Sequence, residues 1–280
     1  MKSVTMLENA VGRSDMDRFG LTLTALDLIL QILGYRPSAV LQDLLSTISD
    51  GTSNRIDWQE RAAWTLRSRA TTRWLDSAHC CILVINGGED DHDSPSGISF
   101  FTSMLVRALN SAERVITLHW FCHQQRNNSV YSMLKSLVCQ LLDKSGGLAI
   151  PPQFAEGGRF TIGNVTAFLM RCLDVQLRSA SVFIMLDSLS YYESGGRVRD
   201  LCWLLDRIAE AVNSPPHSSG HTLKVLVTSP TRFASVGLRL QSRGGVLLDV
   251  PSNVDSGRLD VDDRRVVRGV RERLSGSLRM

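Results

Sequence analysis

From about residue 80 onward, short and nearly continuous apolar runs alternate with longer stretches of helical periodicity. Polar or glycine-rich residues bound each run, which is the pattern of strands separated by turns. Continuous hydrophobicity indicates strands covered on both faces, as in a parallel sheet with helices on each side. The expected strands are residues 81–85, 115–122, 182–186, 223–227 and 246–250. The expected helices between and after them are residues 97–109, 130–142, 165–177, 198–212 and 262–274.

The N-terminal part of the chain has a different pattern. Residues 21–49 show helical spacing on either side of a turn at 34–37, which predicts a helical hairpin, and residues 57–76 predict a further helix. We therefore expect a helical N-terminal segment over 1–76 and an α/β domain over 77–280. A chain of 280 residues can bury a sizeable core in this arrangement.

Composition names no partner but excludes some classes. The net charge of +3 is small, and interleaved Trp and Arg in 57–76 fit an amphipathic helix with a basic outer face, so we expect no nucleic-acid binding. No apolar stretch is long enough for a membrane-spanning helix or a signal peptide. The six cysteines lie scattered in apolar contexts without C-x-x-C pairs, so we expect reduced thiols and a cytoplasmic location.

The first strand runs into the loop GGEDDHDSPSGISFF and then into a helix. This junction is where a phosphate-binding loop with the pattern G-x-x-x-x-G-K-[ST] would lie. The best register places His92 at the first glycine, Gly97 at the second, Ile98 at the lysine and Ser99 at the hydroxyl that binds magnesium. Ser94 lies inside the loop. Two of the four fixed positions therefore match the pattern.

Two later strands carry the remaining parts of a nucleotide site. The strand at 182–186 is followed by Asp187, and a carboxylate at the end of such a strand holds the magnesium hydration shell in P-loop proteins. The strand at 223–227 is followed by the hydroxyls of Thr228 and Ser229. If nucleotide binds, the predicted contacts are therefore Ser94, Gly97, Ile98, Ser99, Asp187 and Thr228, with Ser99 and Asp187 also on the magnesium.

Over residues 71–274 the chain resembles the NACHT-like, nephrocystin-like group of fungal STAND ATPases. The resemblance rests on TTRWLDSAHCCILVING, on VITLHWFCHQQRNNSVYSMLKSLVCQLL, on the strand ending in Asp187, on LKVLVTSP and on LDVDDRRVVRGVRERL, in the expected order. It implies a three-layer P-loop NTPase-like fold with a parallel sheet of about five strands. It also implies a signalling switch controlled by ATP or ADP, with full-length STAND relatives as possible partners.

Three departures argue against hydrolysis. Ile98 replaces the lysine, residues 188–191 replace the acidic pair that usually follows the strand acid, and Pro230 replaces the sensor arginine. Glu193, Arg232, Lys135 and Lys144 are the nearby residues that could substitute. In addition, the acidic residues of EDDHD would repel a polyphosphate. The expected function is a pseudo-NTPase that serves as a regulatory or protein-interaction module, with no cofactor.

Several alternatives stay open. An atypical switch could retain ATP or ADP with magnesium, and the EDDHD loop could instead hold a divalent cation. An unrelated α/β hydrolase is a further possibility, although the chain has no G-x-S-x-G elbow. His119 and His123, at the end of the second expected strand, would form a base or metal pair only if that stretch were helical.

Overall fold

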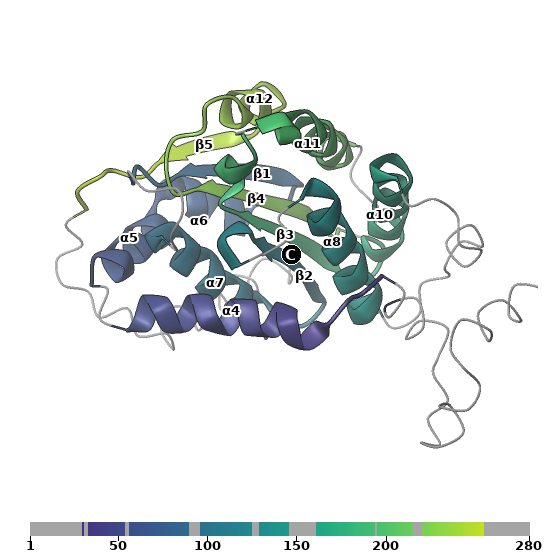
Figure 1. The fold of residues 1–280 in the computed structure, drawn as a ribbon, viewed down its shortest axis with the longest axis horizontal. Helices are drawn as coiled ribbons and strands as arrows, with labels where there is room; N and C mark the ends of the chain where they lie inside the picture. The colour runs from purple at the N-terminus through teal and green to yellow at the C-terminus, as the bar shows by residue number, and fades with distance from the viewer. Residues whose placement is uncertain are drawn as a thin grey trace, which may run out of the picture.

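The computed structural model describes residues 30, 33–53, 56–89, 96–124, 129–145, 161–193, 195–214 and 220–254. Its centre is a five-stranded, fully parallel sheet in the order β2-β3-β4-β1-β5 (Figure 1). The strands are β1 (Cys81–Asn86), β2 (Val115–Phe121), β3 (Ser181–Asp187), β4 (Leu223–Ser229) and β5 (Val246–Asp249). The predicted α/β fold is confirmed, and each expected strand appears within about two residues of its predicted ends.

Helices cover both faces of the sheet. The helices α8 (Val130–Ser145), α10 (Ile162–Gln176), α11 (Val198–Val212) and α12 (Val236–Ser242) lie on one face, and α7 (Gly97–Leu109) lies on the other (Figure 1). The chain thus crosses one face after β1 and the opposite face after β2, β3 and β4. Open α/β sheets bind ligands at the carboxyl ends of the strands where successive connections change face. In this sheet those strands are β1 and β4.

The N-terminal helices are α4 (Pro37–Thr52), α5 (Ile56–Arg67) and α6 (Arg69–Asp76), and their buried side chains join the core of the α7 face. Of these, α4 and α5 form a further layer outside α7, while α6 packs directly on β1 and β5. All residues of α7 except Arg107 are buried as a result. The second arm of the expected hairpin is α4, while its first arm lies mostly outside the described residues. The boundary expected at residue 77 stays a prediction.

Two local features differ from the sequence-based expectation. The helix expected over 57–76 is divided into α5 and α6, because the Ser68 hydroxyl accepts a hydrogen bond from Thr71 N at 3.1 Å and begins a new helix. The short helix α12 was not predicted. The helix expected over 262–274 falls outside the described residues.

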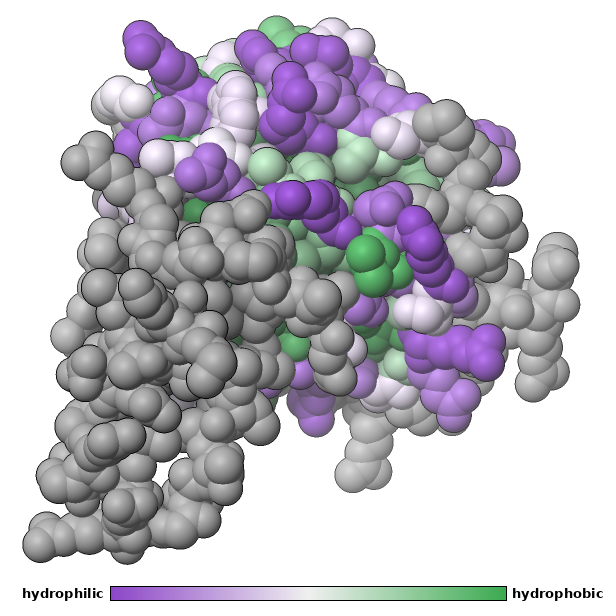
Figure 2. Space-filling model, turned by 90° about the vertical axis from the view of Figure 1, so that its right-hand side faces the viewer, coloured by the Kyte–Doolittle hydropathy of each residue, from purple (hydrophilic) through white to green (hydrophobic). Residues whose placement is uncertain are grey.

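The surface fits the layered arrangement. On the side of the molecule that lies at the right of Figure 1, hydrophilic side chains surround smaller hydrophobic areas among the described residues (Figure 2).

No helix in the described ranges is long and apolar enough to cross a membrane. All six cysteines are free, and Cys122, Cys139 and Cys172 are buried.

Candidate functional site: the carboxyl edge of β1, β3 and β4

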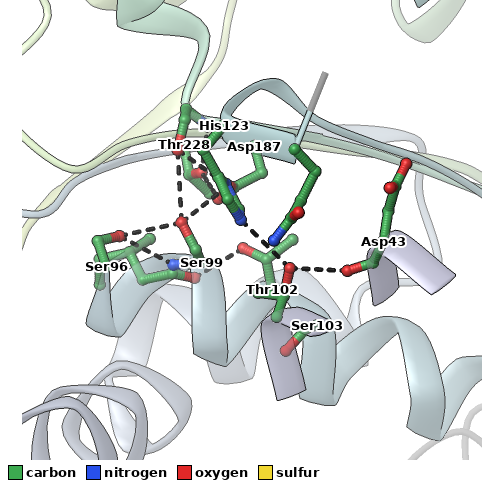
Figure 3. A network of polar contacts seen from close by, with 12 residues as sticks. Asp43, Ser96, Ser99, Thr102, Ser103, His123, Asp187 and Thr228 are labelled. Atoms are coloured by element: carbon green, nitrogen blue, oxygen red, sulfur yellow. Dashed lines mark hydrogen bonds and ion pairs between the residues drawn. The ribbon is translucent and has the colours of Figure 1, made fainter. Parts of the chain in front are cut away.

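Asp187, at the end of β3, is the centre of a buried polar network (Figure 3). Its Oδ2 accepts a hydrogen bond from the Ser99 hydroxyl at 2.8 Å, and its Oδ1 accepts one from the Thr228 hydroxyl at 2.6 Å. All three residues have a relative exposure of 0%. The structure therefore brings three of the predicted site residues together, from α7, β3 and β4, and bonds them directly to one another.

Ser188 adds a third hydroxyl to the same carboxylate. Its Oγ donates to Asp187 Oδ2 at 2.9 Å, and its backbone N–H donates to Thr228 Oγ1 at 3.2 Å. Ser188 has φ 61° and ψ 37°, the left-handed region that is uncommon for a residue other than glycine. These two hydrogen bonds hold it there, so the turn after β3 is fixed by the network that surrounds Asp187.

His123 links this network to the N-terminal helical layer. Its Nδ1 lies 3.5 Å from Asp187 Oδ2, close enough for an ion pair when the ring is protonated but not aligned for a hydrogen bond. Its Nε2 lies 3.3 Å from the Thr47 hydroxyl of α4, which donates to the backbone oxygen of Asp43 (Figure 3). The chain of contacts thus runs from β3 to α4.

Two N–H groups at the N-terminus of α7 donate to side chains of the protein itself. Ser96 caps the helix and accepts a hydrogen bond from Ser99 N at 3.0 Å, while the Glu89 carboxylate accepts one from Gly97 N at 3.0 Å. Free N–H groups at a helix N-terminus normally provide an anion site for phosphate. Here the Glu89 carboxylate occupies the position of an anionic ligand on Gly97 N–H.

Arg61 of α5 holds this arrangement in place. Its Nη1 donates to Gly87 O at 2.7 Å, its Nη2 donates to Ser252 O, and its Nε lies 3.9 Å from Glu89 Oε1. Burial raises the pKa of Glu89 above its usual 4.5, and the Gly97 hydrogen bond and the Arg61 charge offset part of that rise. Glu89 is thus a partly desolvated carboxyl group with two specific partners.

Helix α5 also covers the start of α7. A Cβ on Gly97 would lie 3.0 Å from Arg61 Cβ and 3.2 Å from Trp58 Cα, so a larger residue there would make α5 or its side chains shift by a few tenths of an ångström. Ile98, in the register position of the lysine, is 0% exposed and belongs to the apolar core on the α7 face. The side chain that would reach a phosphate in a P-loop protein is thus a core residue here.

The remaining predicted positions can be placed more briefly. Ser94 and the acidic loop residues 90–93 lie outside the described residues, so the divalent-cation alternative stays a prediction. Within the described ranges, no cluster of three or more His, Cys, Asp and Glu side chains could hold a metal ion. The hydroxyl and carboxylate predicted to share a magnesium ion, Ser99 and Asp187, contact each other.

The sequence matches the family described as Nephrocystin 3, N-terminal, over residues 60–230. The chain belongs to this family. The match runs from within α5 to just past the end of β4 and so contains Arg61, Glu89, Ser99, Asp187 and Thr228. Together with the parallel sheet, it identifies a P-loop NTPase-like domain. The match does not extend to the fungal and STAND assignments that the sequence analysis made.

Comparison with solved structures gives a more distant likeness. The protein titled "Structure of the Aeropyrum Pernix ORC2 protein (ADPNP-ADP complexes)" is 16% identical, with a TM-score of 0.44. The alignment covers 80% of this chain and 52% of the ORC2 chain, so this chain spans about half the length of that protein. No curated protein matches the sequence.

In this family member the basic residues considered as substitutes lie away from Asp187. Lys144 donates to Thr117 O at 2.5 Å, and Arg232 pairs with Asp249 at 3.5 Å with its side chain 77% exposed. Lys135 lines a separate cavity beside β2. None of these three side chains contacts the Asp187 network.

Glu193 caps the N-terminus of α12. Its Oε2 accepts a hydrogen bond from Ala234 N at 2.8 Å, and its Oε1 accepts from Ser235 N and Val236 N at 2.7 Å each and from the Ser235 hydroxyl at 3.0 Å. A carboxylate with four donors does not need a water molecule as a partner. Glu193 therefore joins the turn after β3 to the turn after β4.

Replacing Glu193 with alanine should lower the free energy of unfolding by about 1 to 2 kcal/mol, because several N–H groups at a helix start lose their acceptor. Urea denaturation followed by circular dichroism measures the change. The matched control is Glu210→Ala, since Glu210 is 45% exposed and pairs only with Arg207 among the described residues; it should change stability by less than about 0.5 kcal/mol. Equal effects of the two substitutions would contradict the capping role.

The two histidines discussed for the hydrolase alternative do not act as a pair. Both rings pack against Phe121, with centroids 5.6 and 6.0 Å from that ring. His119 Nε2 lies 3.5 Å from Val40 O, whereas His123 faces Asp187. A serine nucleophile needs a histidine between itself and the acid. Here Ser99 and Ser188 donate directly to Asp187 with no histidine between them. The described residues therefore do not form a Ser-His-Asp arrangement.

The sequence analysis did not place Arg61, Ser96 and Ser188 in the site, and it considered Glu89 only as a source of repulsion. Of these, only Ser96 carried a usable signal, since a serine just before a helical run is a typical N-cap. Arg61 lies 26 positions before its partner Gly87, and such a contact depends on how α5 packs against α7.

Proposed function

We propose that the protein is a non-hydrolysing pseudo-NTPase, a P-loop NTPase-like domain that serves as a regulatory or protein-interaction module. One observation carries this proposal. The groups that would hold phosphate and magnesium already have hydrogen-bond partners within the protein. Gly97 N–H donates to Glu89, and the hydroxyls of Ser99 and Thr228 donate to Asp187. A nucleotide would have to displace these buried contacts before it could form its own.

The absence of a usable lysine supports the same proposal. Among the described residues, the lysines are Lys135, Lys144 and Lys224, and none reaches the α7 N-terminus. The Lys224 ammonium donates to Leu75 O at 2.5 Å and lies 5.6 Å from the Phe183 ring centre. Leu75 precedes β1, so this ammonium lies toward the amino ends of the strands. Phosphoryl transfer depends on cations placed at the phosphates, so hydrolysis is not expected.

The proposed cellular setting rests on the cysteines, and the proposed partners rest on the sequence resemblance. We place the protein in the cytoplasm, which the six free thiols favour. We further propose a signalling role of the STAND type in a fungal context, with full-length STAND relatives as protein partners. No cofactor belongs to this proposal.

Thermal unfolding with millimolar magnesium-ATP or magnesium-ADP tests the proposal. We expect no change in midpoint. A ligand at 100 times its dissociation constant would add about 2.7 kcal/mol to the folded state, which raises the midpoint of a domain of this size by several degrees. A lysine-bearing P-loop ATPase serves as the positive control.

A clear rise in midpoint would favour the second candidate, an atypical nucleotide-binding switch. Arg61 is the observation on its side, since its guanidinium lies beside the α7 N-terminus. In that case Arg61→Gln should remove the rise, while Arg178→Gln, at an exposed position on the far side of the sheet, should leave it unchanged.

A further inference from the structure

A cavity of about 250 Å³ lies at the free edge of the sheet, beside β2. Its walls are the turn before α4 with the first turns of that helix, the carboxyl-terminal half of β2, and the outer face of α8. Because β2 is the edge strand, α4 covers its open side and leaves this space between the two. The volume suits a compact ligand of one or two rings.

Two cationic side chains stand at this cavity on different elements. Arg36 precedes α4 and Lys135 belongs to α8. Neither forms an ion pair or hydrogen bond within the described residues, and the one acid in the described lining is Asp43. Two cations without anionic partners beside a concave surface attract a negatively charged group. Ser132, one turn before Lys135, adds a hydroxyl.

The floor of the cavity is aromatic and uncharged. His119, Trp120 and Phe121 of β2 all contribute to it. His119 is 5% exposed, and burial lowers its pKa to about 4, so the imidazole is neutral at physiological pH. Its Nδ1 has no hydrogen-bond partner among the described residues. That nitrogen is itself buried, so it does not open onto the cavity.

We propose that this cavity binds a small aromatic carboxylate, with the ring against the β2 side chains and the carboxylate between Arg36 and Lys135. The apolar floor supplies the contact area and the two cations supply the selection for a negative group, which is the usual division of roles in ligand pockets. The cavity adjoins the Asp187 network, because its lining includes Asp43, which accepts a hydrogen bond from Thr47, and Phe121, whose ring packs against His123. Asp187, Ser99, Ser188 and Thr228 are not part of the lining.

The experiment uses 2-naphthoate as the probe, measured by saturation-transfer NMR and titration calorimetry on the full chain. The uncharged isostere naphthalene-2-carboxamide is the ligand control. We expect 2-naphthoate to bind with a dissociation constant of about 1 mM or tighter, as an ordinary ligand efficiency for about 13 non-hydrogen atoms gives. The amide should bind about tenfold more weakly.

Two variants locate the site. Arg36→Gln combined with Lys135→Gln should weaken 2-naphthoate binding about tenfold and leave the amide unchanged. Ala39→Phe, at an exposed position of α4 on the cavity wall, should block both ligands. The control is Arg178→Gln, a 72% exposed cation outside the cavity. Unligated melting curves show that each variant is folded. Equal binding of acid and amide, an unchanged affinity in the double variant, or no binding at millimolar probe would overturn the proposal.

Discussion

Replacing Asp187 with alanine should lower the free energy of unfolding by about 3 to 4 kcal/mol. The carboxylate is fully buried and accepts hydrogen bonds from the hydroxyls of Ser99, Ser188 and Thr228. Alanine leaves these three donors without an acceptor in a place that water does not reach. Removal of a buried charge relieves its desolvation and offsets part of the loss.

This result would distinguish a structural aspartate from one kept for magnesium. A buried aspartate whose role is to bind magnesium destabilises the protein when no cation is bound. Its replacement should therefore leave the free energy of unfolding unchanged or raise it. Equilibrium urea denaturation without nucleotide measures the difference. A loss below about 1 kcal/mol for Asp187→Ala would contradict the closed network.

Matched variants make the measurement specific. Asp174→Ala, at a 55% exposed position, should change stability by less than about 0.5 kcal/mol. Thr228→Val should cost about 1 kcal/mol by itself. In the double variant with Asp187→Ala the two losses should not add, because both substitutions remove the same 2.6 Å contact.

Sequence patterns predicted the sheet well because each strand has a local signal. The strands are continuous apolar runs with polar ends, and α7 and α11 begin and end where their periodicity does. The order of strands in the sheet has no such local signal, since it depends on which helix covers which face. The division at Ser68 was visible in principle as a serine cap, but the uninterrupted helical periodicity on both sides concealed it.

The candidate site was predictable only in part. The end-of-strand rule indicated Asp187 and Thr228, because carboxyl ends of parallel strands meet at one edge of a sheet. It did not indicate that Ser99 would donate to Asp187 directly, since that depends on how closely α7 packs against β3. The acidic loop was expected to act by repulsion, whereas Glu89 acts through one specific hydrogen bond to Gly97.

Restoring the missing lysine provides the second large prediction. Ile98→Lys should lower the free energy of unfolding by about 4 kcal/mol or more and should not create nucleotide binding. Ile98 is 0% exposed in the core between α7 and the sheet, and an ammonium group without a partner there is strongly destabilising. In a P-loop that still accepts phosphate, the same lysine would instead point to the ligand.

Ile98→Met is the matched control, since it conserves volume and hydrophobicity and should cost less than about 1.5 kcal/mol. Urea denaturation gives the stabilities, and melting with magnesium-ATP shows whether binding appears. If Ile98→Lys keeps its stability and gains several degrees with magnesium-ATP, the α7 N-terminus is open to phosphate and the pseudo-NTPase proposal fails. A large loss of stability in this variant alone, with no response to nucleotide, means that position 98 is used for packing. In that case the site differs from a P-loop in its core packing as well as in its loop sequence.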